Sequence, residues 1–136
     1  MRVLLIIALM IISLTTVAET IECQNTDLDI RLTIITSLYD FPEANMNIDF
    51  NIGEIKKQFE LVGFYKSGYS FDTNEGYSGY DIPLNGDPLT RKELISYSFY
   101  NDKTVGEGYI DMKEFELNYA KLQCLIVNEN VVQINY

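Results

Sequence analysis

Apolar and polar residues alternate without a break over residues 44–52. Successive side chains of a β-strand point to opposite faces, so a period of two predicts a strand with one buried and one solvated face. A helix would spread the same apolar residues around its circumference. The buried face is expected to consist of Ala44, Met46, Ile48, Phe50 and Ile52.

Weaker alternation predicts further strands along the chain. They are expected at residues 21–24, 28–34, 55–65, 93–100, 106–112, 115–127 and 131–134, with turns at 25–27, 37–43 and 101–103. Gly53-Glu54 is a short connection typical of a β-hairpin. Short strands at a spacing of about ten residues indicate an all-β fold, a small antiparallel β-barrel or β-sandwich.

Residues 66–88 differ in composition from the segments around them. They contain four glycines and two prolines, which predicts a long loop, with a short strand around residues 80–84. Long loops are often functional, so the aromatic residues in and beside this segment are candidates for binding a partner. The alternative is that these side chains fold back and cap one end of the barrel or sandwich. The candidates are Tyr65, Tyr69, Phe71, Tyr77 and Tyr80.

The N-terminus has the features of a secretory signal peptide. Met1-Arg2 is basic, residues 3–14 are apolar, and Thr16-Val17-Ala18 is a small-residue cleavage site. A retained anchor is the alternative, but the apolar run is short for about 30 Å of hydrocarbon. We therefore predict a signal peptide at 1–18 and a single β-domain at 19–136. The mature protein is expected to be secreted, periplasmic or extracellular, without membrane insertion.

The two cysteines, Cys23 and Cys124, lie near the two ends of the predicted domain. In an oxidising compartment they are expected to form one disulfide. Closing a loop of about a hundred residues stabilises a fold by about 4–5 kcal/mol in the chain-entropy model. The alternative is two free thiols, one of them a nucleophile. The chain has no histidine to activate a thiolate.

Charge limits the classes of partner. The chain has 10 Lys and Arg against 20 Asp and Glu, a formal net charge of −10. This balance disfavours nucleic acid and anionic lipid as partners. A negative surface also serves solubility alone. The partner is therefore expected to be a protein or a glycan.

The residue types limit the possible chemistry as well. The absence of histidine excludes a Ser-His-Asp triad and removes the usual ligand of zinc sites. No glycine-rich phosphate-binding motif is present. A pair of carboxylates could still hydrolyse glycosides, which leaves a small carboxylate-based hydrolase as an alternative. The prediction is a protein without catalytic residues or a cofactor.

Residues 107–115 resemble the second half of an EF-hand calcium loop, in their glycine, isoleucine and final glutamate. The resemblance implies that Glu114 would bind calcium with both carboxylate oxygens. The first two ligand positions are occupied by Lys103 and Val105. The alternative is a β-turn containing Gly106 and Gly108. An acidic segment at residues 72–76 is either a second calcium loop or an ordinary turn.

Three hypotheses for the function follow. The preferred one is a secreted binding or inhibitor-like module, of the kind that bacteria export, because tyrosines provide large and rigid contact surfaces. It predicts an exposed cluster of Tyr69, Tyr77 and Tyr80. The second is a calcium-binding envelope protein that uses Asp72, Asn74, Glu107 and Glu114. The third is the carboxylate-based hydrolase.

Overall fold

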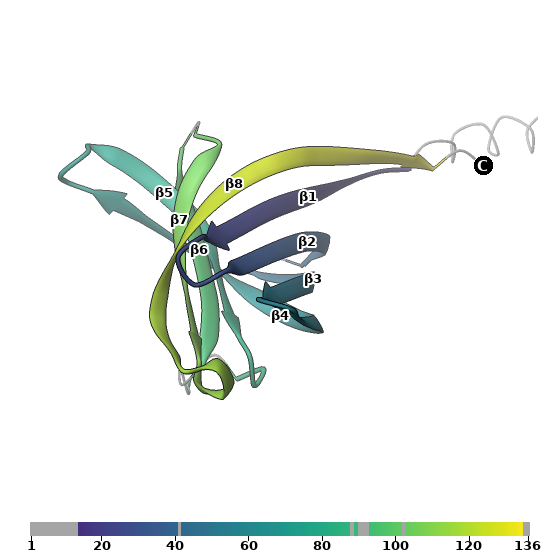
Figure 1. The fold of residues 1–136 in the computed structure, drawn as a ribbon. Helices are drawn as coiled ribbons and strands as arrows, with labels where there is room; N and C mark the ends of the chain where they lie inside the picture. The colour runs from purple at the N-terminus through teal and green to yellow at the C-terminus, as the bar shows by residue number, and fades with distance from the viewer. Residues whose placement is uncertain (1–13, 41, 88, 90–92, 102, 135–136) are drawn as a thin grey trace, which may run out of the picture.

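The computed structural model describes residues 14–40, 42–87, 89, 93–101 and 103–134 (Figure 1). Nearly all of these residues belong to β-strands. The strands are β1 (Leu14–Asn25), β2 (Ile30–Asp40), β3 (Glu43–Ile52), β4 (Ile55–Ser70), β5 (Glu75–Pro83), β6 (Leu94–Tyr100), β7 (Val105–Met112) and β8 (Leu117–Ile134). A short 3-10 helix, η1 (Lys113–Phe115), precedes β8.

The strands form a closed antiparallel barrel. Each strand pairs with its neighbour in sequence, and β1 pairs with β8. In Figure 1, β1 to β4 run across the direction of β6 and β7, while the long strand β8 curves through both parts. The predicted all-β fold is confirmed, and of the two predicted architectures the protein has the barrel.

The apolar residues of the alternating segment 44–52 line the inside of this barrel. Met46, Ile48 and Phe50 are at most 2% exposed, whereas the polar residues between them face solvent. β2 contributes the same kind of face, because Ile34 is paired with Ile48 and is also fully buried. The interior is filled by apolar side chains, chiefly Ile21, Ile30, Leu32, Ile34, Met46, Ile48, Phe50, Ile82, Ile95, Tyr97, Ile110 and Leu122.

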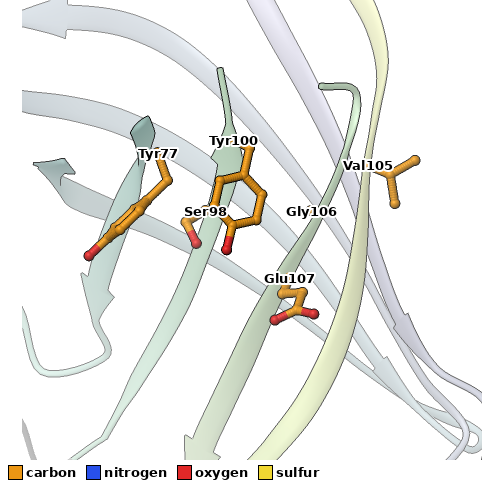
Figure 2. A pocket seen from close by; sticks show the side chains of 6 residues that line it. All are labelled: Tyr77, Ser98, Tyr100, Val105, Gly106 and Glu107. Atoms are coloured by element: carbon orange, nitrogen blue, oxygen red, sulfur yellow. The ribbon is translucent and has the colours of Figure 1, made fainter. Parts of the chain in front are cut away.

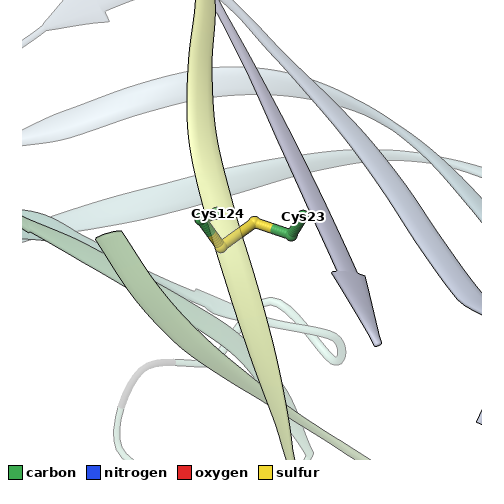
Figure 3. Close-up of a disulfide and its surroundings, with 2 residues drawn as sticks. All are labelled: Cys23 and Cys124. Carbon is green, nitrogen blue, oxygen red and sulfur yellow. A yellow bond between two sulfur atoms is a disulfide. The ribbon is translucent and has the colours of Figure 1, made fainter. Parts of the chain in front are cut away.

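A disulfide connects the two strands that close the barrel. Cys23 of β1 and Cys124 of β8 are register partners, and both are buried. They form a disulfide across 101 residues of sequence (Figure 3). The predicted pairing is therefore confirmed, and the alternative of two free thiols is wrong.

The prediction of a loop over residues 66–88 is wrong. The segment contains the end of β4 and all of β5, joined by a turn at residues 71–74. Its glycines lie in strands because neighbouring groups need their space. A Cβ atom at Gly79 would overlap with the carbonyl oxygen of Tyr97, and one at Gly68 would overlap with the ring of Tyr77. A glycine in a strand can thus mark close packing and not a loop.

The strand predicted at residues 106–112 is confirmed as β7, whereas the alternative of a β-turn containing Gly106 and Gly108 is wrong. Gly106 and Gly108 lie inside β7, and η1 follows, so this segment forms neither a β-turn at the glycines nor a calcium loop between helices. Two smaller boundaries change as well. The strand predicted at 131–134 is the end of β8, and β2 continues to Asp40 where a turn was expected.

The predicted signal cleavage site coincides with the point at which β1 joins the barrel. Pairing between β1 and β2 begins at Glu19, opposite Thr36. Residues 14–18 pair only with β8. Cleavage after Ala18 would therefore remove none of the pairs between β1 and β2. Residues 1–13 of the predicted signal peptide lie outside the described residues, and the cleavage stays a prediction.

Candidate functional site

The hairpin of β4 and β5 extends beyond the strands on either side of it. β3 pairs with β4 only as far as Phe64, and β6 pairs with β5 only from Tyr77 onward. Residues 66–76, which we call the projecting hairpin, are held mainly by pairing between β4 and β5. Figure 1 shows it at the upper left, away from the other strands. Both of its faces are therefore accessible.

One face of the projecting hairpin carries exposed aromatic side chains at its tip. Tyr69 is 49% exposed and Phe71 is 91% exposed. Their ring centroids are 5.5 Å apart with an edge-to-face orientation. The Tyr69 hydroxyl donates a hydrogen bond to Oδ1 of Asn74, which has a left-handed backbone with φ of 57°. The turn therefore fixes the Tyr69 side chain while leaving it in solvent.

Aromatic rings also extend from the barrel interior toward this face. The ring of Tyr97 in the core is 6.1 Å from that of Tyr80, and Tyr80 is 5.8 Å from Tyr65. Tyr65 is 38% exposed and leads into the hairpin four residues before Tyr69. Side chains four residues apart in a strand lie on the same face. A series of aromatic side chains on one face therefore runs from the core to the exposed tip.

Tyr80 lies between the buried ring of Tyr97 and the exposed ring of Tyr65. Burial raises the pKa of its hydroxyl above the usual value of 10.0, and the negative charges of Glu19 and ionised Tyr65 raise it further. Burial acts in this direction because a low dielectric disfavours the charged phenolate. Tyr80 is therefore a neutral hydroxyl group at physiological pH.

Tyr77 lies on the opposite face of the hairpin. Its ring covers Gly68 of β4, and its centroid is 6.3 Å from that of Tyr100 on β6. The structure therefore divides the predicted cluster. Tyr65, Tyr69 and Phe71 share one side of the hairpin with the half-buried Tyr80, whereas Tyr77 faces away from them.

The structure also contains a pocket that the sequence did not reveal. It has a volume of about 270 Å³ and lies on the outer surface of β5, β6 and β7 (Figure 2). We call it the outer tyrosine pocket. Its position depends on the register of three strands, which cannot be read from their separate sequences. It is lined by Tyr77, Ser98, Tyr100, Val105, Gly106 and Glu107.

The predicted calcium ligands are not gathered into one site. The Glu114 carboxylate forms an ion pair with Lys57, whose Nζ also lies 5.3 Å from the centre of the Phe115 ring. The Asn74 side-chain oxygen accepts the hydrogen bond from Tyr69. Among the residues that the structure describes, no group of three or more Asp, Glu, His or Cys side chains is placed to hold a metal ion.

A lysine, a serine and an aspartate form a polar cluster on β4, β5 and β6. Lys66 Nζ is 2.8 Å from Oδ1 of Asp81, and Ser96 Oγ donates a hydrogen bond of 2.7 Å to the same oxygen. Lys66 also donates to Ser96. Ser96 is 1% exposed, so the cluster connects strands and does not present a nucleophile.

Two acidic side chains do share a pocket, as the hydrolase hypothesis requires. Asp49 of β3 and Glu60 of β4 line a hollow of about 440 Å³ on the outer surface. Both residues are exposed. Acid–base pairs of glycosidases depend on burial or a close like charge to separate the pKa values of the two carboxyls. Asp49 and Glu60 lack such burial.

Comparisons with known proteins add no family to these observations. Neither a protein-family model, nor a curated protein, nor a solved structure matches the chain. Within the described residues, no helix is long and apolar enough to cross a membrane.

Proposed function

We propose that the protein is an exported, non-catalytic binding module that contacts a protein or glycan through its projecting hairpin. The observation that carries the proposal is the exposure of Tyr69 and Phe71 at a tip that stands away from the barrel. Large aromatic side chains normally gain free energy by burial. Two of them packed together in solvent are typical of a surface that a partner covers.

The rigidity of the hairpin supports the same function. Residues 64–70 of β4 pair continuously with residues 75–81 of β5. The turn is held by the hydrogen bond between Tyr69 and Asn74, and by one from the Thr73 amide to Ser70 Oγ. Side chains that are fixed before association lose less entropy when a partner binds. The hairpin therefore presents its aromatic tip in an ordered form.

The scaffold is consistent with a location outside the cytoplasm. Its buried disulfide agrees with an oxidising compartment, as the predicted signal peptide requires. The core side chains occupy the barrel interior, so we place the binding surface on the outside. The net charge of −10 supports a partner other than nucleic acid.

Site-specific crosslinking tests the proposal. A photoreactive amino acid replaces Phe71 in one variant and Leu28 in a control variant, and both proteins are exposed to the medium and envelope fractions of the source cells. Leu28 is 46% exposed in the β1–β2 turn, at the other end of the antiparallel barrel. We expect a discrete adduct from position 71 that Tyr69→Ser abolishes, and none from position 28. Equal labelling at both positions, or no adduct at 71, would contradict the proposal.

A further inference from the structure

The outer tyrosine pocket exists because small and large side chains alternate on the outer surface of β5 and β6. Tyr77 is the register partner of Tyr100, and in the next outward-facing row Gly79 is the partner of Ser98. The same Ser98 is paired with Glu107 on β7. Gly79 and Ser98, the second row, therefore form a pocket floor of small side chains. Two tyrosine rings stand beside it, and a carboxylate lies at its end (Figure 2).

The polar groups of this pocket are not used to hold the fold. Within the part of the chain that the structure describes, the side chains of Tyr77, Ser98, Tyr100 and Glu107 form no hydrogen bond or ion pair. The pocket thus offers three hydroxyl groups, which both donate and accept, and one carboxylate, which accepts. Its aromatic surface comes from two rings that are nearly perpendicular, at 88°.

From these features we propose that the outer tyrosine pocket binds one neutral saccharide ring of a glycan. The face of a sugar ring carries C–H groups, which are attracted to the negative face of an aromatic ring. Its hydroxyl groups match the hydroxyls and the carboxylate of Ser98 and Glu107. A volume of about 270 Å³ accommodates a single ring. No lysine or arginine lines the pocket, which disfavours an acidic sugar.

The inference rests on the proposed function, since it names the class of partner for a pocket that adjoins the projecting hairpin. Tyr77 belongs to the pocket and also covers Gly68, which lies in the projecting hairpin. A glycan held in the pocket can therefore continue along the outer face of the hairpin.

A cationic group is the competing ligand, because two aromatic rings and a carboxylate also bind ammonium ions. The three hydroxyl groups of the pocket favour a saccharide over such an ion. A saccharide both donates hydrogen bonds to hydroxyl groups and accepts them, whereas an ammonium ion cannot accept.

Nuclear magnetic resonance of the oxidised mature protein tests the proposal. The probes are the methyl glycosides of glucose, galactose, mannose and N-acetylglucosamine, with tetramethylammonium as the cationic probe. We expect at least one glycoside to shift the amide resonances of Ser98, Gly106 and Glu107. Glu107→Gln should raise the Kd of that glycoside about fivefold, and Tyr100→Leu about tenfold or more, the loss expected for one charge-assisted hydrogen bond and one aromatic contact.

Glu60→Gln is the matched control, because Glu60 is also an exposed glutamate on the outer face of a strand. It should leave the Kd unchanged. The saccharide assignment is overturned if no glycoside shifts these resonances, if Glu60→Gln and Glu107→Gln weaken binding equally, or if only tetramethylammonium binds. Any of these results can occur while crosslinking at position 71 succeeds, so failure here is distinguishable from failure of the hairpin proposal.

Discussion

Cys23 and Cys124 face each other in the register that closes the barrel, with their Cα atoms 4.0 Å apart. The disulfide therefore joins the first and last strands, whose two cysteines are 101 residues apart in sequence. In the chain-entropy model, the benefit of a crosslink grows with the length of the loop that it closes. The same pair of strands also provides the pairing that leaves the barrel without an open seam.

Removal of this disulfide should destabilise the protein strongly. We expect the double variant Cys23→Ala/Cys124→Ala to lose about 3–5 kcal/mol of unfolding free energy, close to the value expected for a loop of about a hundred residues. Urea denaturation of the variant and the oxidised protein measures the difference. A loss below about 1 kcal/mol would show that strand pairing alone holds the seam.

The two phenylalanines Phe50 and Phe71 should respond oppositely to truncation. Phe50 is 0% exposed and its ring lies 5.6 Å from that of Phe115, so Phe50→Ala leaves a cavity and should cost about 3–5 kcal/mol. Phe71 is 91% exposed, so Phe71→Ala should change stability by less than about 0.5 kcal/mol. Urea denaturation of both variants checks this. Similar losses would contradict the placement of Phe71 in solvent.

Gly79 and Gly68 should differ in their tolerance of a methyl group. A Cβ atom at Gly79 meets the backbone of Tyr97 and Ser98, which cannot move without disturbing β6. At Gly68 it meets only the Tyr77 side chain, which can rotate. We expect Gly79→Ala to cost about 1–3 kcal/mol, and Gly68→Ala distinctly less. Equal melting temperatures for the two variants would refute this account of the hairpin.

Tyr80 should make stability depend on alkaline pH. Its pKa is raised in the folded state by burial, Glu19 and Tyr65, so the unfolded chain releases this proton at a lower pH than the folded one. The stabilisation is fully present below the unfolded pKa of about 10 and is lost as the pH rises through the folded value. Melting temperatures between about pH 9 and 12 should fall less steeply for Tyr80→Phe. Identical slopes of melting temperature against pH for the two proteins would contradict this role of Tyr80.

Calcium should not stabilise the protein. Glu114 is engaged with Lys57, and in the described part of the chain no cluster of acidic side chains is placed around a cation. A ligand raises the melting temperature only if it binds the folded state. We expect equal melting curves with calcium and with EDTA. A rise of several degrees with calcium would contradict this prediction and indicate a calcium site, with Asp72 and Glu107 as the candidate ligands.

The alternation in residues 44–52 was sufficient to predict a buried strand face, because the period of two follows directly from strand geometry. The disulfide was predictable because only two cysteines are present and both lie near the ends of the domain. These two signals are local or compositional. They identified the all-β class and its covalent closure.

The β4–β5 hairpin was not predicted, because its glycines have the composition of a loop. Gly79 is required by the close approach of β6 and Gly68 by the ring of Tyr77, and neither contact is visible before the strands are paired. The outer tyrosine pocket depends on Ser98 lying between Gly79 and Glu107, which is a property of register. Single-sequence patterns indicate which face a residue occupies, but not its neighbours across strands.

In the proposed function, the exposed tip of the projecting hairpin binds the partner. The most direct test is the affinity of the oxidised mature protein for the partner captured at position 71, compared with the double variant Tyr69→Ser/Phe71→Ser. We expect the Kd to rise more than about tenfold while the barrel stays folded, since both side chains are exposed and lie outside the core. An unchanged Kd would contradict the claim and place the binding surface elsewhere on the barrel.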